Sequence, residues 1–140
     1  MMIIDIGQYR IDIDVCKTSR FYESAHPISL SCSCDGCRNY ETAVSYLPTQ
    51  ITDLFTKLGI DMRKACEVYV NCKNHDGTLL YGGFYHLCGS ILAGENAWVQ
   101  TSPTTRHWDN NLAYEIMNYH CKKSFIILIT RQKISFYLHF

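Results

Sequence analysis

Apolar and polar residues alternate near the start of the chain, over residues 9–15. The apolar positions are Tyr9, Ile11, Ile13 and Val15, and the polar positions are Arg10, Asp12 and Asp14. Successive side chains of a strand point to opposite faces, so this period of two predicts a half-buried β-strand. We expect it to pair with a strand at residues 3–6 across a turn at Gly7-Gln8. Residues 16–31 are polar, contain Pro27 and predict an irregular segment.

The hydrophobic period then lengthens to that of a helix. Apolar residues fall at i, i+3, i+4 and i+7 in the set Ile51, Leu54, Phe55 and Leu58, which predicts an amphipathic helix. Residues 37–47 also predict a helix, and Pro48 either kinks one continuous helix or begins the second one. Gly59 suits the left-handed position that follows a helix. The sequence therefore predicts a helical segment over about residues 37–58.

Strand patterns return after residue 66. Residues 67–73 and 78–92 predict two strands joined at Asp76-Gly77, a dipeptide that favours a two-residue hairpin turn. Residues 97–101, 112–119 and 125–140 predict further strands, with a polar loop over residues 102–111. The predicted fold class is α+β, with an antiparallel β-sheet of about five to seven strands. The helical segment is expected after the first strands, packed on one face or end of the sheet, in a single domain spanning residues 1–140.

The balance of charge and the distribution of apolar residues argue against nucleic-acid-binding, membrane and secreted proteins. The 13 basic and 13 acidic residues balance, so we expect neither nucleic acid nor an anionic membrane as a partner. The start of the sequence lacks the features of a signal peptide, and no apolar stretch approaches the roughly 20 residues of a membrane span. We therefore expect a cytoplasmic protein. A protein partner or a homo-oligomer stays open.

Three of the eight cysteines fall within six residues, in a C-x-C-x2-C pattern. They are Cys32, Cys34 and Cys37, with Asp35-Gly36 supplying a turn between them. Cysteines of a cytoplasmic protein are thiols or metal ligands more often than disulfides, and zinc takes thiolates in tetrahedral sites. A helix beginning here would favour thiolates over thiols. The pattern predicts a zinc site; the alternative is three thiols that bind no ligand.

A tetrahedral site needs a fourth ligand, and His86 is our candidate, with Cys88 as the alternative. The two lie two residues apart on a predicted strand and so share a face. A two-residue turn at Asp76-Gly77 would pair Glu67 with His86 and Tyr69 with Phe84. Glu67 would then orient the histidine through a hydrogen bond. The alternative for His86 is a core histidine bonded to a backbone carbonyl.

Three segments carry a resemblance to a known family. They are Cys32 to Tyr40, Phe55 to Asp61, and Tyr81 to Gly89. Together they resemble a small family of bacterial proteins, mostly from Firmicutes, over about residues 1–115. The family has no established activity, so the resemblance implies a bacterial context and no function. Its members typically end in an acidic, aromatic strand, whereas residues 116–140 of this chain are basic and therefore atypical. One hypothesis is that an altered reading frame produced this segment.

Three functions remain. The first is a non-enzymatic domain with a structural zinc site. The second is a thiol-based redox or metal sensor, because Cys34 and Cys37 have the C-x2-C spacing of oxidoreductases. The third is a zinc-dependent hydrolase-type enzyme, with the three cysteines as ligands and Glu67 or His86 as acid–base. The chain has no H-E-x2-H, Walker A, G-x-G-x2-G or G-x-S-x-G motif, so the enzyme is the least favoured of the three.

Overall fold

The computed structural model describes the backbone of residues 1–94, 98–108, 114–118, 123–130 and 133–139. It describes the side chains of residues 1–94, 100–105 and 107. The helices are α1 (Val15–Ser24), α2 (Ile28–Ser31), α3 (Asp35–Ala43) and α4 (Thr49–Lys57), with 3₁₀ turns η1 (Val44–Tyr46) and η2 (Met62–Lys64). The strands are β1 (Met2–Ile6), β2 (Tyr9–Ile13), β3 (Glu67–Lys73), β4 (Leu79–His86), β5 (Gly89–Ala93), β6 (Trp98–Gln100), β7 (Arg106–Trp108), β8 (Tyr114–Asn118), β9 (Lys123–Thr130) and β10 (Lys133–His139).

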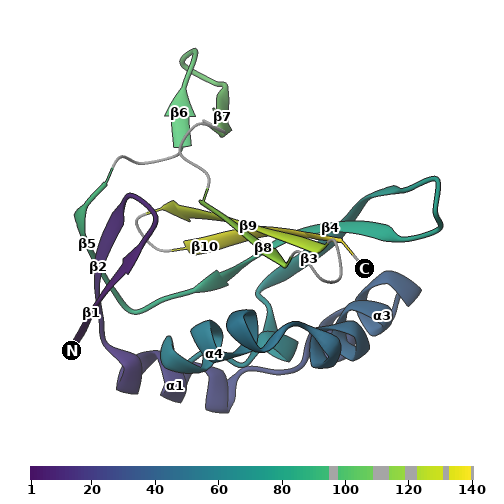
Figure 1. Cartoon of the computed structure of the whole chain (residues 1–140), viewed down its shortest axis with the longest axis horizontal. Helices are drawn as coiled ribbons and strands as arrows, with labels where there is room; N and C mark the ends of the chain where they lie inside the picture. The colour runs from purple at the N-terminus through teal and green to yellow at the C-terminus, as the bar shows by residue number, and fades with distance from the viewer. Residues whose placement is uncertain (95–97, 109–113, 119–122, 131–132, 140) are drawn as a thin grey trace.

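The strands of the described chain form antiparallel sheets ordered β1-β2-β5, β3-β4-β10-β9-β8 and β6-β7. Figure 1 shows α1, α3 and α4 together on one side of the strands, with the β6–β7 hairpin projecting on the other. Strands followed by segregated helices and then more strands define an α+β fold. The predicted fold class is therefore confirmed, including the place of the helices after the first strands.

The first hairpin is confirmed, because β1 and β2 pair with Ile6 opposite Tyr9. The expectation of an irregular segment over residues 16–31 is wrong, since α1 and α2 occupy most of it. The Asp14 side chain accepts a hydrogen bond from the Lys17 N–H at 2.9 Å and so caps α1. Thr18 and Tyr22, four residues apart, are the buried positions of this otherwise polar helix. Two buried positions were too few to register as a stripe.

The predicted helical segment consists of α3, η1 and α4. Pro48 precedes α4 as its N-cap, so it begins a second helix and does not kink a continuous one. Gly59 has φ of +75°, and the Ile60 N–H bonds to the Phe55 carbonyl at 2.9 Å. This is the left-handed helix ending that the sequence predicts.

The second hairpin forms, but its register differs from the predicted one. The Asn74 N–H bonds to the Thr78 carbonyl at 2.8 Å, so the turn is one residue longer than two. A bulge between Val70 and Cys72 shifts the pairing again. Glu67 consequently lies opposite Phe84, and the predicted pairing of Glu67 with His86 is wrong.

The later strands are shorter than predicted. Residues 78–92 form two strands, β4 and β5, which belong to different sheets. The predicted loop over residues 102–111 contains β7, which pairs with β6. The predicted strand over residues 125–140 is likewise two strands, β9 and β10. Residues 109–113, 119–122, 131–132 and 140 of these segments lie outside the described residues.

The core lies between the helices and the sheets, and tyrosines form much of it. Tyr40 from α3 and Tyr81 and Tyr85 from β4 are each 0% exposed, and Phe55 from α4 packs edge-on against Tyr85. Tyr81 and Tyr85 are four residues apart on one strand, so both point to the face that the helices cover. Side chains of strand β4 therefore contribute to holding α3 and α4 against the sheet.

Candidate metal centre

Cys32, Cys34 and Cys37 come together at the start of α3. Their sulfurs all lie within 4.8 Å of one another, and those of Cys32 and Cys34 are 3.2 Å apart. Cys32 and Cys34 are exposed, whereas Cys37 is only 5% exposed and belongs to the hydrophobic core. Among the described residues, no other group of three or more His, Cys, Asp or Glu side chains brings its ligand atoms this close together.

Two helix ends place these side chains. Cys32 follows α2, and its N–H bonds to the Ile28 carbonyl at 2.9 Å. Cys34 is the N-cap of α3, and its sulfur accepts the Cys37 N–H at 3.4 Å. A side-chain acceptor at this position satisfies a backbone donor that the first helical turn leaves without a partner. The expectation that the cysteine loop leads into a helix is confirmed, with the helix beginning at Asp35.

Contacts from the sheet hold the back of the loop. The Tyr81 hydroxyl donates to the Gly36 carbonyl at 3.0 Å and accepts from the Asn39 amide at 2.8 Å. A Cβ on Gly36 would lie 3.1 Å from the Val70 side chain, so glycine allows α3 to approach β3 this closely. One turn further along, the Tyr40 hydroxyl contacts the Tyr85 hydroxyl, which donates to the Met62 carbonyl at 2.8 Å. Polar and apolar contacts with β3 and β4 thus fix the first two turns of α3.

The pKa values of Cys34 and Cys37 are shifted in opposite directions. The Cys37 N–H, followed by the Cys32 thiol, lowers the pKa of Cys34 to about 7, because hydrogen bonds to a thiolate stabilise its charged form. Burial, followed by the neighbouring Cys34 and Cys32, raises the pKa of Cys37 to about 12. Near neutral pH the sulfur of Cys34 is therefore partly ionised in the protein without a metal, whereas Cys37 keeps its proton. A thiophilic cation would favour loss of the other protons.

The sulfur positions fit a small thiophilic ion. Zinc binds thiolates at about 2.3 Å, which in tetrahedral geometry places the sulfurs about 3.7 Å from one another. The observed separations, 3.2 Å for one pair and no more than 4.8 Å for any, bracket that value. The loop therefore needs only small side-chain rotations to bind such an ion. Three sulfur donors also exclude magnesium and calcium as natural occupants, because those ions prefer oxygen.

The structure does not bring the other predicted site residues to the three sulfurs. The His86 ring packs edge-on against Phe21 and Phe84, with centroids 5.8 and 5.6 Å away. The His86 N–H donates to the Tyr22 hydroxyl at 2.9 Å, which returns a bond to the His86 carbonyl.

Cys88 is likewise outside the sulfur group, and its N–H donates to the Thr18 hydroxyl at 3.1 Å. Glu67 is exposed on β3, opposite Phe84. The predicted pairing of Glu67 with His86 depended on the two-residue turn, which the structure replaces with a longer one. The shared strand predicted for His86 and Cys88 is also interrupted, because β4 ends at His86 and β5 begins at Gly89.

The sequence reasoning missed the tyrosines that hold the loop. Tyr81, Gly83 and Tyr85 alternate with other residues along β4, so their common face was readable from the sequence. The sequence does not predict the contact between Tyr81 and Gly36. The two residues lie 45 positions apart, and no local pattern encodes their contact.

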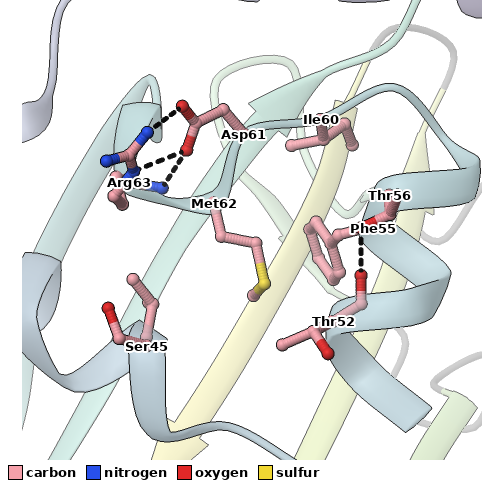
Figure 2. Close-up of a pocket in the computed structure, with 9 residues that line it drawn as sticks. Ser45, Thr52, Phe55, Thr56, Ile60, Asp61, Met62 and Arg63 are labelled. Carbon is pink, nitrogen blue, oxygen red and sulfur yellow. Dashed lines mark hydrogen bonds and ion pairs between the residues drawn. The ribbon is translucent and has the colours of Figure 1, made fainter. Parts of the chain in front are cut away.

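A separate hollow lies away from the cysteines, between η1, α4 and η2. It is an open groove with a volume of about 310 Å³. Figure 2 shows the Met62 and Phe55 side chains pointing toward one another across it, with the ion pair of Asp61 and Arg63 at one side. The groove is lined by both apolar and polar side chains and contains no group of metal-ligating side chains. It therefore does not extend the cysteine site.

Comparisons with known proteins add no relationship to this geometry. No protein-family model, curated protein or solved structure matches the chain. Within the described residues, none of the helices has the length and apolar character needed to cross a membrane.

Proposed function

We propose that the chain is a metal-binding domain in which Cys32, Cys34 and Cys37 hold one zinc ion. The observation that carries this proposal is the convergence of three sulfurs within 4.8 Å at one helix start. Thiolate donors select soft or borderline ions, and zinc is the common one bound by closely spaced cysteines in proteins. The partial positive charge at the start of α3 further favours the thiolate forms of the ligands.

The proposed role of the ion is structural and local. It would join Cys32 at the end of α2 to Cys34 and Cys37 in the first turn of α3. This connection is short, so the ion would order the turn between the two helices. We expect metal removal to disturb that turn and to leave the tyrosine contacts on the other side of α3 in place.

Elemental analysis of freshly purified protein tests the proposal. We expect one zinc per chain in the wild-type protein and a loss of most of it in Cys34→Ser, since a serine hydroxyl is a poor zinc ligand. Cys16→Ser is the matched control, because Cys16 is also an exposed cysteine but lies on α1. His86→Ala should retain the ion. Zinc at background level, or full zinc content in Cys34→Ser, would refute the proposal.

A second candidate function is thiol-based redox sensing, favoured by a different observation. The sulfurs of Cys32 and Cys34 are 3.2 Å apart, and the pKa of Cys34 is lowered to about 7 by the Cys37 N–H and by Cys32. A thiolate beside a second thiol is the arrangement that oxidants convert to a disulfide. Hydrogen peroxide would take two electrons and two protons from the pair and be reduced to water, so mass mapping would show a Cys32–Cys34 disulfide lighter by two hydrogen atoms. Stable thiols in metal-free protein would count against this candidate.

The donor set does not favour the hydrolytic alternative. Three thiolates donate more charge to a zinc ion than the neutral histidines common in hydrolytic sites, so such an ion acidifies bound water less. Glu67 and His86, the acid–base candidates of a hydrolase, also lie outside the sulfur group. We therefore propose that this site binds a zinc ion and does not catalyse hydrolysis.

A further inference from the structure

The sulfurs of Cys32, Cys34 and Cys37 form a small triangle on one short segment of the chain. The three residues fall within six positions, and their sulfurs all lie within 4.8 Å of one another. Cys32 and Cys34 are exposed, whereas Cys37 is 5% exposed. A thiophilic atom from solvent can therefore reach the first two sulfurs directly and the third within the same helical turn.

One side of this triangle is shorter than tetrahedral zinc requires. The sulfurs of Cys32 and Cys34 are 3.2 Å apart, whereas thiolates at about 2.3 Å from a tetrahedral zinc ion lie about 3.7 Å from one another. Trivalent arsenic bonds to three sulfurs as a pyramid, because a lone pair occupies its remaining position. Its bond angles are narrower than tetrahedral, so it holds its sulfurs closer together than zinc does. The spacing at this side of the triangle therefore favours trivalent arsenic.

The charge of the complex favours the same element. Three thiolates on a divalent ion leave a net charge of about −1, and the Asp35 side chain, which follows Cys34 in the chain, is 96% exposed and paired with Arg38. Three thiolates on trivalent arsenic leave no net charge. The arsenic complex therefore places no additional negative charge beside the Asp35 carboxylate.

We infer that Cys32, Cys34 and Cys37 bind trivalent arsenic, taken up as arsenous acid, in a complex with three thiolates. The inference rests on the proposed function of these sulfurs as a site for thiophilic ions, and it names a second ligand for them. It uses these three sulfurs alone, so a further zinc ligand elsewhere in the chain would leave it unchanged. In zinc-loaded protein the arsenic would replace the zinc ion.

The exchange of bonds needs no oxidant or reductant. Arsenous acid, As(OH)3, has three hydroxyl groups, and in metal-free protein each thiol gives its proton to one of them. Three As–O bonds break, three As–S bonds form, and three water molecules leave, while arsenic stays trivalent. In zinc-loaded protein the three protons come from solvent and zinc leaves as the divalent ion. The Cys37 N–H already donates to the Cys34 sulfur at 3.4 Å, so the buried cysteine is in place to form the third bond.

Native mass spectrometry of protein treated with sodium arsenite tests the inference. We expect one arsenic per chain in place of three hydrogen atoms, with Cys32, Cys34 and Cys37 protected from alkylation. In zinc-loaded protein, a chromogenic chelator should detect one zinc ion released for each arsenic bound. Cys16→Ser is the matched control, because Cys16 is an exposed cysteine of α1, and it should behave like the wild-type protein.

Phenylarsine oxide separates the third bond from the first two. Its arsenic carries a phenyl group and so bonds to only two sulfurs. Cys37→Ser should still bind phenylarsine oxide through Cys32 and Cys34, whereas its arsenite adduct should retain one hydroxyl group. Because Cys37 is buried and its replacement can disturb the core, Cys34→Ser at an exposed position is the second variant. It should likewise lose the three-sulfur arsenite adduct.

The outcomes separate this inference from the proposed function. A wild-type protein that forms no arsenite adduct, or one that retains a hydroxyl group, would overturn the inference, whereas its zinc content would still decide the zinc site. The same three-sulfur adduct in Cys34→Ser would place arsenic on other cysteines and would also overturn the inference. A three-sulfur adduct on Cys32, Cys34 and Cys37 in protein that purifies with background zinc would support the inference and refute the zinc site.

Discussion

Removal of single hydroxyl groups from Tyr40 and Tyr85 tests how α3 is held against the sheet. Both side chains are 0% exposed, and their hydroxyls contact each other across the interface between α3 and β4. The Tyr85 hydroxyl also donates to the Met62 carbonyl at 2.8 Å. Tyr→Phe substitution removes only the oxygen, so the aromatic packing of the core is kept.

The magnitude follows from the number of bonds lost. Each buried hydrogen bond contributes a net of about 0.5–1.5 kcal/mol, and more where a buried group is deprived of its partner. Tyr85→Phe removes two such contacts, so we expect a loss of about 1.5–3 kcal/mol in the free energy of unfolding. Tyr40→Phe removes the shared contact and should cost about 1–2 kcal/mol. The double variant should lose less than the sum by about 0.5–1.5 kcal/mol, because the shared contact is counted twice.

Urea unfolding of chelator-treated protein is the appropriate assay, since it isolates the protein contacts from any metal contribution. Tyr46→Phe is the matched control, because Tyr46 is 77% exposed; it should change stability by less than about 0.5 kcal/mol. Fully additive losses in the double variant would refute a direct Tyr40–Tyr85 contact. Losses no larger than that of the control would refute the burial of the two hydroxyls.

The same tyrosines predict a response to high pH. Burial raises the pKa of both Tyr40 and Tyr85 above the ordinary value of about 10. A raised folded-state pKa gives stability that is fully present below the unfolded-state pKa and lost as pH rises above it. We therefore expect these tyrosines to ionise only with unfolding at alkaline pH. Early ionisation of all ten tyrosines, measured by ultraviolet absorbance, would contradict this.

Three further predictions concern other parts of the chain. In metal-free protein, iodoacetamide should modify Cys34 with half its maximal rate near pH 7. Cys37 should stay largely unreacted, because burial raises its pKa to about 12. Peptide mass mapping measures both. Gly59→Ala should cost about 2–4 kcal/mol in urea unfolding, because φ is +75° and a Cβ would lie 2.6 Å from a side-chain oxygen of α1, whereas Gly77→Ala, at φ +86° in open space, should cost about 1–2 kcal/mol. Asp61→Asn should lower the free energy of unfolding by at most about 1 kcal/mol at neutral pH and not at all at low pH. The hydrogen bond from the neighbouring arginine lowers the pKa of Asp61, so the stabilisation is lost as pH falls through that lowered value. Equal losses in unfolding experiments at both pH values would contradict this.

Elements defined by neighbours in sequence were predictable here. The β1–β2 hairpin followed from a period of two, and α4 followed from its apolar stripe and from Pro48 and Gly59 at its ends. The gathering of the three cysteines was predictable for the same reason, because C-x-C-x2-C spacing at a helix start leaves the sulfurs few other arrangements. These features are determined mainly by local backbone geometry.

The failures came where a distant contact decides the outcome. Helix α1 has two buried positions and a capped start, and its stability depends on packing that a polar sequence does not reveal. The register of β3 on β4 depended on one extra turn residue and one bulge, each of which moves every later pair. The assignment of Glu67 beside His86 therefore failed, although the bounds of β3 agree with the prediction.

The spacing of the cysteines cannot distinguish a zinc ion that maintains the whole fold from one that binds at its surface. That distinction depends on what else holds the helix to which the cysteines belong. Here Tyr81 bonds to Gly36 within the motif itself, through a backbone carbonyl and not through a sulfur. Because this contact from the sheet fixes the loop independently of the sulfurs, a bound ion would add order to the turn without being required for the core. Domain stability and metal occupancy should therefore vary independently, and Tyr81→Phe should lower stability far more than chelation does.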